Sequence, residues 1–299
     1  MVAFTPEQLA TLSAILDEGT FDGAARRLHV TASAVSQRIK AMELTAGQIL
    51  VERSNPVRLT AAGDVVLRYA RQVELLQQDT ARELGRAASD GGVVTVPVAV
   101  NADSLATWFL EAASLLYEVT GVEAVFDIHR DDQDHTAELL RSGAVMAAVT
   151  SASQAVQGCS VTSLGRMRYR AVCSPSFAQR FLDERASVES LGSAPVVNFD
   201  RKDQIQRQFF RDYTGRSLRS PRHYVPTSAD YARAVVFGMG WGMLPEQQCA
   251  AEIDQGVLLD LAPEHPIDIA LYWQRWNLTS PTLDAVSSVV ESVAREQLR

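Results

Sequence analysis

The sequence lacks the features that would place a protein outside the cell or in a membrane. Its 299 residues include three cysteines, far apart and without a CxxC pair, which argues against disulfides and structural zinc and for a reducing compartment. No apolar run reaches the length of about 18 residues that a membrane span needs. No basic region followed by an apolar stretch opens the chain, so no secretory signal is expected. We therefore expect a cytoplasmic protein with no membrane partner.

The common signatures of catalysis are also missing. The chain contains no G-x-S-x-G, no H-E-x-x-H and no P-loop, and its glycine-rich segment 238–245 lacks the dinucleotide-binding spacing. Its five histidines are scattered, without a metal-like pair. We therefore expect neither an enzyme nor a bound cofactor or metal ion.

Acidic residues outnumber basic ones, giving a formal net charge of −8, but the imbalance is uneven along the chain. Residues 20–60 hold six Lys or Arg against three Asp or Glu, whereas residues 91–299 hold 18 against 25. Phosphate binding needs a local basic patch, and the acidic remainder would repel phosphate. The distribution predicts DNA binding at residues 20–60, and the small local excess predicts that two or more copies bind one DNA.

Residues 21–44 have the spacing of two short helices joined by a tight turn. Apolar side chains recur every three or four residues in both halves, and the small Ala24 and Ala25 allow the helices to cross closely. Thr31 suits the cap of the second helix, because its hydroxyl can accept an unpaired backbone N–H. This is the helix-turn-helix arrangement that places a helix in the DNA major groove. An ordinary helical hairpin with a solvated charged face fits the spacing equally well.

The candidate DNA contacts form two chemical groups. Base edges can be read by the amide of Gln37 and the hydroxyls of Ser33 and Ser36, on the polar face of the second helix. The cations suit phosphate contacts, which position a protein rather than specify a sequence. The predicted DNA-binding set is Arg26, Arg27, Thr31, Ser33, Ser36, Gln37, Arg38, Lys40, Arg53 and Arg58.

The residues that follow favour the DNA-binding interpretation. Residues 50–53 and 57–59 are strand candidates around the turn 54–56, which makes a wing, and Thr60 then caps a long helix. Residues 1–63 resemble the DNA-binding domain of LysR-type transcriptional regulators. One departure, at residues 43–47, concerns the last turn of the recognition helix, where the family usually has Leu-Glu-x-x-Leu-Gly. The matching motifs are Gly19-Thr20-Phe21, Ala24-Ala25, Ala34-Val35-Ser36 and Leu59-Thr60-Ala61-Ala62-Gly63.

Residues 60–90 contain no proline and predict a long helix between the winged domain (1–59) and the remainder. Apolar and small residues recur along it at spacings of 3, 4, 3, 4 and 7, which is typical of a helix that pairs with another helix. Packing against its own domain is the alternative. The resemblance implies that this linker helix forms the dimer. The predicted seam is Val66, Tyr69, Val73, Leu76, Thr80 and Ala87.

Residues 91–299, which follow a domain boundary at 89–92, alternate strand candidates with helical segments, so we predict a parallel sheet with crossover helices. The resemblance implies the type 2 periplasmic-binding-protein fold, with lobe one at about 91–165 and 268–299 and lobe two at about 166–267. The predicted fold class is an N-terminal winged helix-turn-helix with a linker helix, followed by a two-lobe α/β effector-binding domain. Strand candidates lie at 93–100, 122–128, 145–150, 169–173, 195–199, 222–226, 241–244 and 269–273, and helices at 102–117, 136–142 and 282–297.

Ligands of two-lobe α/β domains bind at strand carboxyl ends and helix N-termini, and this rule selects candidate residues. Asp103 follows the first strand, where it is either a first-turn acid without a function or the partner of a ligand's ammonium group. Asp131 and Asp132 belong to an acidic loop that is either solvated or part of a cation-attracting cleft wall. The predicted effector-binding set is Asn101, Asp103, Ser104, Asp131, Asp132, Thr150, Ser228 and Asp230.

Three further motifs, 101–108, 194–200 and 271–273, are similar to the arginine/lysine-responsive regulators of basic amino-acid export and synthesis, and extend the resemblance over nearly the whole chain. The subgroup implies lysine or arginine as effector, with its carboxylate near Ser104 and Ser228 and its side-chain cation near an aspartate.

We therefore expect a homo-oligomeric transcription regulator, a dimer or tetramer, that binds double-stranded operator DNA and a basic amino acid. RNA polymerase is a further candidate partner. The alternative is a small-molecule-binding protein whose N-terminal domain serves only for association. Failure of an operator-length duplex to bind the intact dimer at low salt would favour that alternative.

Overall fold

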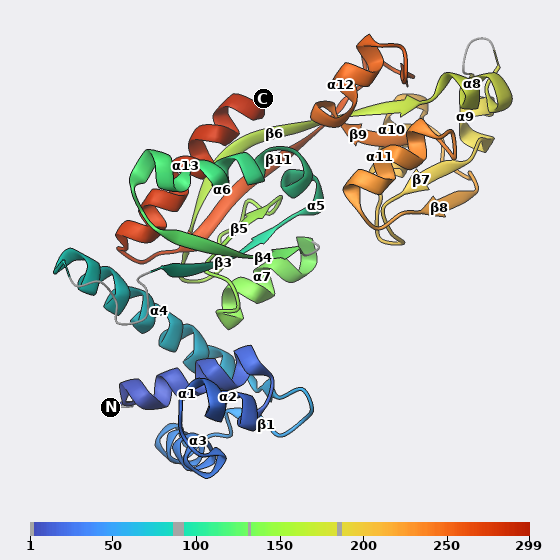
Figure 1. Ribbon diagram of the computed structural model, residues 1–299. Helices are drawn as coiled ribbons and strands as arrows, with labels where there is room; N and C mark the ends of the chain where they lie inside the picture. Colours follow the sequence, from blue (N-terminus) through green and yellow to red (C-terminus); the bar gives the residue numbers. More distant parts are fainter. Residues whose placement is uncertain (1–2, 86–92, 131–132, 184–186) are drawn as a thin grey trace.

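The computed structural model describes residues 3–85, 93–130, 133–183 and 187–299 (Figure 1). A small helical domain at the N-terminus is followed by one long helix and then by a two-lobed α/β domain. Several predictions lie outside the described residues: Ala87 of the seam, the domain boundary at 89–92, and the acidic Asp131 and Asp132.

The N-terminal domain has the predicted winged helix-turn-helix fold. Each of its three helices begins at a threonine, Thr5, Thr20 or Thr31, whose hydroxyl accepts the backbone N–H three residues further on. The two wing strands are antiparallel, with Val51 opposite Leu59. The elements are α1 (Pro6–Glu18), α2 (Phe21–Arg27), α3 (Ala32–Ala46), β1 (Val51–Glu52) and β2 (Arg58–Leu59).

The recognition helix α3 ends where the sequence departs from the family pattern. Gly47 adopts the left-handed φ of 67°, and its N–H bonds back to the carbonyl of Glu43. The side chain of Glu43 accepts the backbone N–H of Leu50 at 3.0 Å. Glu43 and Gly47, which keep the Glu and the Gly of the family pattern, therefore stop the helix and tie its last turn to the wing.

The long helix α4 (Ala61–Glu83) is present as predicted, but the predicted seam is divided between two faces of it. Val66 is buried in the core of the N-terminal domain. Tyr69 and Leu76 are exposed by 49% and 39% in the single chain, and Val65 joins them at 69%. Apolar residues stand next to each other along α4, one exposed and one buried, as at Val65 and Val66. Spacing alone could therefore not decide which of the two apolar faces packs on the domains of the same chain.

One mixed sheet runs through both lobes in the order β10-β6-β11-β5-β3-β4, with β9 beside β6. The parallel arrangement predicted holds for β3, β4 and β5, whereas β6 and β11 are antiparallel to each other. These two strands carry the chain out to lobe two and back, so they run in opposite directions (Figure 1). The strands are β3 (Val94–Val100), β4 (Ala124–Arg130), β5 (Ala147–Thr150), β6 (Cys159–Cys173), β9 (Gly242–Pro245), β10 (Leu259–Asp260) and β11 (Ile267–Trp276).

Helices pack on the sheet in lobe one and surround a second, small parallel pair of strands in lobe two (Figure 1). In the described ranges, no helix is both long enough and apolar enough to cross a membrane. Lobe one contains α5 (Ala102–Ser104), η1 (Leu105–Phe109), α6 (Leu110–Thr120), α7 (Gln133–Ser142) and α13 (Pro281–Gln297). Lobe two contains α8 (Pro175–Phe181), α9 (Val188–Ser193), β7 (Val196–Asn198), α10 (Ile205–Thr214), β8 (Arg222–Tyr224), α11 (Ser228–Val236) and α12 (Glu246–Asp254).

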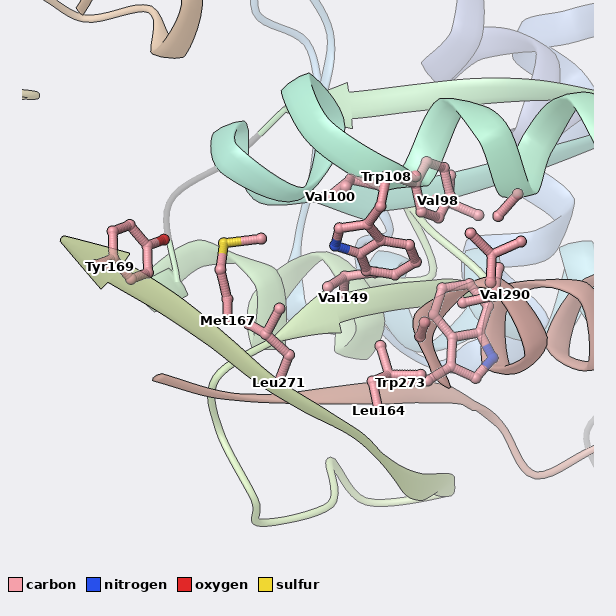
Figure 2. Close-up of a cluster of buried hydrophobic side chains, with 14 of the residues drawn as sticks. Val98, Val100, Trp108, Val149, Leu164, Met167, Tyr169, Leu271, Trp273 and Val290 are labelled. Carbon is pink, nitrogen blue, oxygen red and sulfur yellow. The ribbon is translucent and has the colours of Figure 1, made fainter. Parts of the chain in front are cut away.

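The helix predicted at 102–117 contains a π-helical turn, η1, close to its start. Trp108 and Phe109 are both fully buried, and the wider π turn lets two neighbouring aromatic side chains face the same core. Figure 2 shows Trp108 next to Val149 of the sheet and Trp273 close to α13. This packing fixes the beginning of the helix, where it meets the end of β3.

Candidate functional site

The outer face of α3 carries the residues predicted to contact bases. Ser33, Gln37 and Lys40 are exposed and follow one another at intervals of four and three residues, so they share one face of the helix. Ser36 is partly buried beside them. Thr31 accepts the N–H of Ala34 at 3.1 Å, which makes it the cap of this helix. The arrangement presents an amide, a hydroxyl and an ammonium group to a DNA groove.

Three of the predicted phosphate-binding cations lie on the surface around α3. Arg26 and Arg58 are exposed, on α2 and on the wing. The guanidinium of Arg53 lies over the ring of Phe21, 5.6 Å from its centre, and this contact holds the wing against α2. Exposed cations on α2 and on the wing are suited to phosphate contacts, which position a protein on DNA.

Two other predicted DNA contacts, Arg27 and Arg38, have hydrogen-bond partners within the N-terminal domain. Arg27 pairs with Asp17 of α1 at 2.7 Å. Arg38 donates a hydrogen bond to the hydroxyl of Thr11 at 3.2 Å, and its side chain therefore ties α3 to α1. Sequence reasoning could not find these pairs, because their partners lie 10 and 27 residues away.

A cavity of about 640 Å³ opens between the two lobes. Lobe one contributes residues 101–103, which follow the carboxyl end of β3, and Arg130, the last residue of β4. Lobe two contributes residues 199–200 and 202–206, after the end of β7 and at the start of α10. Tyr169 lines the cavity from β6, on the crossing between the lobes. The cavity thus has the position and the size that small-molecule sites have in two-lobe domains.

Asp103 is the acidic group where the lobes meet. Its carboxylate accepts hydrogen bonds from the hydroxyl of Tyr169 and from that of Ser228 in lobe two, both at 2.7 Å. Burial raises the pKa of Asp103 above its usual range, and the two hydroxyl donors only partly oppose this effect. Asn101 caps the helix beneath it by accepting the N–H of Ser104 at 2.8 Å. Asp103 is therefore held in place by contacts from both lobes.

The wall formed by lobe two carries the carboxylates of Asp200 and Asp203 and the ammonium group of Lys202, and its own hydrogen bonds hold the two carboxylates in place. Asp203 accepts the N–H of Phe199 and the amide of Gln206, both at 2.8 Å. Gln206 in turn donates to the hydroxyl of Tyr231 at 3.0 Å. Asp200 accepts the backbone N–H of Asp203 at 2.8 Å. Two carboxylates thus face the cavity from a loop whose backbone is already ordered.

Other predicted effector contacts have different surroundings. Ser104 is fully buried, and its hydroxyl has no hydrogen-bond partner among the described residues. Thr150 is buried and accepts the N–H of Ala152 at 3.1 Å. Asp230 is exposed and accepts hydrogen bonds from Thr227 and from Arg233 of its own helix.

Sequence reasoning missed Tyr169, Asp200, Asp203 and Arg130. Three of them lie at or shortly after the carboxyl end of a strand, the place that selected Asp103, so the same rule applied to residues 196–198 and 124–130 would have found them. Tyr169 lies within the long strand β6 and begins the strand predicted at 169–173, so a rule that selects only carboxyl ends of strands did not find it.

Comparison with known proteins agrees with this architecture. Residues 6–64 match the family described as bacterial regulatory helix-turn-helix protein, lysR family, and residues 102–295 match the LysR substrate binding domain. The lysine export transcriptional regulatory protein LysG of Corynebacterium glutamicum is 39% identical over 299 residues, which cover 98% of this chain and 99% of that protein.

Two solved structures cover the full chain. ArgP from Mycobacterium tuberculosis is 40% identical, with a TM-score of 0.87 and 99% of each chain covered. Full-length LysG from C. glutamicum with bound effector Arg is 37% identical, with a TM-score of 0.78 over 99% of this chain and 100% of that one. Both domain matches and these full-length similarities lead to one conclusion: the chain belongs to the LysR family of bacterial regulatory helix-turn-helix proteins.

Proposed function

We propose that the protein regulates transcription by binding operator DNA through its winged helix and lysine or arginine between its lobes. The observation that carries the effector assignment is the Asp103 carboxylate, which faces the interlobe cavity and takes one hydrogen bond from β6 and one from lobe two. A carboxylate offers about four lone-pair sites, so about two remain for the N–H donors of a ligand. A cationic group is the ligand that such a carboxylate favours, because a charge withdrawn from water needs an opposite charge.

The other charges around the cavity fit an amino acid with a basic side chain. Asp200 and Asp203 add acidic groups from lobe two, and two cations complete the charged lining: Lys202 from lobe two and the guanidinium of Arg130 from lobe one. Sequence reasoning placed the effector's carboxylate near Ser104 and Ser228. We now assign it to Arg130, because Ser228 donates to Asp103 and a guanidinium binds a carboxylate with two parallel hydrogen bonds.

The relatives support the same effector class. LysG of C. glutamicum is named for lysine export, and its structure contains Arg as bound effector. We transfer both to this chain as a proposal: its effector is lysine or arginine, and the genes it controls serve export or synthesis of basic amino acids. The proposal places the protein in the cytoplasm, with RNA polymerase as a further partner.

DNA binding on this proposal uses a homo-oligomer, a dimer or a tetramer. The exposed stripe of Val65, Tyr69 and Leu76 on α4 is suited to pairing with the same helix of a second copy, since large apolar side chains in one row favour burial. Two winged helices then read two half-sites of one operator. Effector binding favours one arrangement of the copies over another by the difference in affinity between them.

Calorimetric titration of the full-length protein with lysine, arginine and leucine tests the effector. Saturable heats with lysine or arginine and none with leucine are the expected result. Binding of leucine with equal affinity, or of no amino acid, would refute the basic-amino-acid assignment while leaving the DNA-binding half untouched.

Selection from a random duplex library spanning about four helical turns tests the DNA half. The full-length protein should enrich a sequence with two related half-sites, and binding should weaken steeply with salt. Enrichment of no sequence at low salt, with the oligomer intact, would favour the alternative in which the N-terminal domain serves only for association.

A further inference from the structure

The linker helix is fastened to lobe one by two arginines that bind backbone carbonyls. Arg68 donates to the carbonyls of Gln157 and Gly158, both at 3.0 Å. Arg71 donates to the carbonyls of Gly143 and Ala144 at 2.8 and 2.7 Å. These turns precede β6 and β5, so α4 grips the edge of the sheet at which both strands begin.

Arg71 also faces the DNA-binding domain. Its second terminal nitrogen donates to Asp17 of α1 at 2.9 Å, and its side chain is only 14% exposed. The other oxygen of Asp17 accepts from Arg27, the last residue of α2, at 2.7 Å. Arg27 precedes the turn into the recognition helix. One guanidinium and one carboxylate therefore connect lobe one with the helices that carry α3.

The contact is close enough to need glycine. Gly143 has a φ of 79°, and a Cβ built there would lie 2.6 Å from the Cα of Arg68. A left-handed turn without a side chain thus lets α4 approach the backbone of lobe one directly. The carbonyls of this turn then point at Arg71.

A second fastening lies further along α4. Asp79 is 4% exposed and accepts hydrogen bonds from Thr282, at 2.6 Å, and from Ser280, the cap of α13. Arg82 donates both to Asp79 and to Thr282, at 3.1 and 3.0 Å. Helix α4 is held by lobe one at two places more than one helical turn apart, so it cannot pivot on that lobe without breaking one of them.

The same strands lead from these contacts to the effector cavity. β6 begins directly after Gly158 and reaches Tyr169, which bonds Asp103, about 35 Å away at the usual rise of a strand. β5 begins shortly after the 143–144 turn and ends at Thr150, alongside the end of β3. A stiff strand therefore links each turn at α4 with the cleft edge of the sheet.

We propose that Arg71 is a positioning residue: through Asp17 and the 143–144 turn it sets the pose of the DNA-binding domain on lobe one and so couples effector binding to operator affinity. The inference rests on the proposed function for its effector and operator. The guanidinium suits this place because one terminal nitrogen bonds the two carbonyls and the other bonds the carboxylate, whereas the three donors of lysine all diverge from a single nitrogen.

The test compares Arg71→Lys and Asp17→Asn with Arg141→Ala, an exposed arginine on α7, the helix that leads into the same turn. Operator affinity is measured on the duplex selected above, with and without saturating arginine, and arginine affinity is measured by calorimetry. In the unaltered protein, arginine should change operator affinity by at least about fivefold. In Arg71→Lys and in Asp17→Asn the change should fall to within about twofold of none, with arginine affinity unaltered. Arg141→Ala should behave like the unaltered protein.

The double variant should lose no more than either single variant, because both remove one shared connection. A full response to arginine in Arg71→Lys would overturn the inference. Failure of the unaltered protein to bind lysine or arginine would overturn the proposed effector instead.

Hydrogen exchange in the absence of effector tests whether Arg71 stabilises the 143–144 turn and the end of α1. In Arg71→Lys, amides of residues 143–146 and of the end of α1 should exchange about tenfold faster, with lobe two unchanged, since each loses a charged hydrogen-bond partner. Unaltered exchange at both places would also overturn the inference.

Discussion

Replacing Asp103 by asparagine tests the contribution of its negative charge to effector binding without disturbing the fold. The side chain keeps its size and one carbonyl oxygen, so one of the two hydroxyl donors, Tyr169 or Ser228, keeps its acceptor. What disappears is the negative charge that faces the cavity. The expected result is a protein that folds normally and binds lysine and arginine far more weakly.

The magnitude follows from the environment of the carboxylate. A hydrogen bond to a charged group contributes about 1.5–3 kcal/mol, and leaving a fully buried partner charge unpaired costs about 3–5 kcal/mol. Asp103 is partly buried at the cavity, which places the loss between these cases, at about 2–4 kcal/mol. That corresponds to an increase in Kd of about 30- to 700-fold.

Calorimetry with lysine and arginine measures this change, and Asp212→Asn is the matched control. Asp212 is an exposed carboxylate on α10, the helix whose first residues line the cavity, so its replacement should leave Kd within about twofold. Because burial raises the pKa of Asp103, its ionised form destabilises the folded protein, and Asp103→Asn should unfold at an equal or higher temperature at neutral pH. An arginine Kd within about threefold of the unaltered value would refute the assignment of the cation to Asp103.

Three further predictions concern pH, DNA and the contact between α4 and lobe one. Arginine affinity should rise as the pH increases through the raised pKa of Asp103 and then level off, because the cation binds the ionised carboxylate. Below that pKa, binding should release a proton, which calorimetry in buffers of different ionisation enthalpy detects. Gln37→Ala should cost about 1–3 kcal/mol on the selected operator and relax its sequence preference, whereas Arg58→Ala should weaken all duplexes alike and lower the salt slope by about one; equal effects of both variants on unrelated DNA would contradict this division. Gly143→Ala should lower the melting temperature more than Gly121→Ala, because only at Gly143 would the added Cβ clash with Arg68 of α4. Gly121 has a similar φ of 67° and nothing within 4 Å of the added Cβ, so backbone strain of about 1–3 kcal/mol is common to both variants. Equal melting temperatures would mean that the 143–144 turn shifts to accommodate the methyl group.

Local signals explain why the N-terminal domain was predictable. Threonine caps, apolar spacing and a turn rich in polar residues act within a few positions of one another, and the structure shows Thr20, Thr31 and Thr60 each accepting the N–H three residues on. The roles of the arginines were not predictable in the same way. Whether an arginine is available for DNA phosphate or pairs with a carboxylate of the protein depends on the folded domain, which brings distant residues together, as in the pair of Arg27 and Asp17.

The effector cleft was found in part for a similar reason. The strand-end rule selected Asp103 and Ser228, and the structure joins these two residues across 125 positions of sequence. The rule says nothing about where in a long strand the lobes cross. Of residues 159–168 only Leu164 and Met167 are buried, and their spacing gives no two-residue apolar period, so β6 was predicted only in its last third and Tyr169 was not recognised as a lining residue.

The contacts with α4 belong to lobe one, and this restricts how an effector can change DNA affinity. Lobe one holds Asp103, the two turns that bind Arg68 and Arg71 of α4, and the cap of α13, which donates a hydrogen bond to Asp79 of α4. The DNA-binding domain is packed on the same helix α4, with Leu67 and Ala70 buried in its core. Closing the cleft therefore moves lobe two against a body that already includes the recognition helix. An effector changes DNA affinity in two ways on this scheme: lobe two meets a neighbouring copy differently, or the cleft edge of β5 and β6 strains the contacts of Arg68 and Arg71. Only the second route passes through Arg71. Arg71→Lys, which should leave arginine affinity unaltered, therefore distinguishes the two routes by whether operator affinity still responds to arginine.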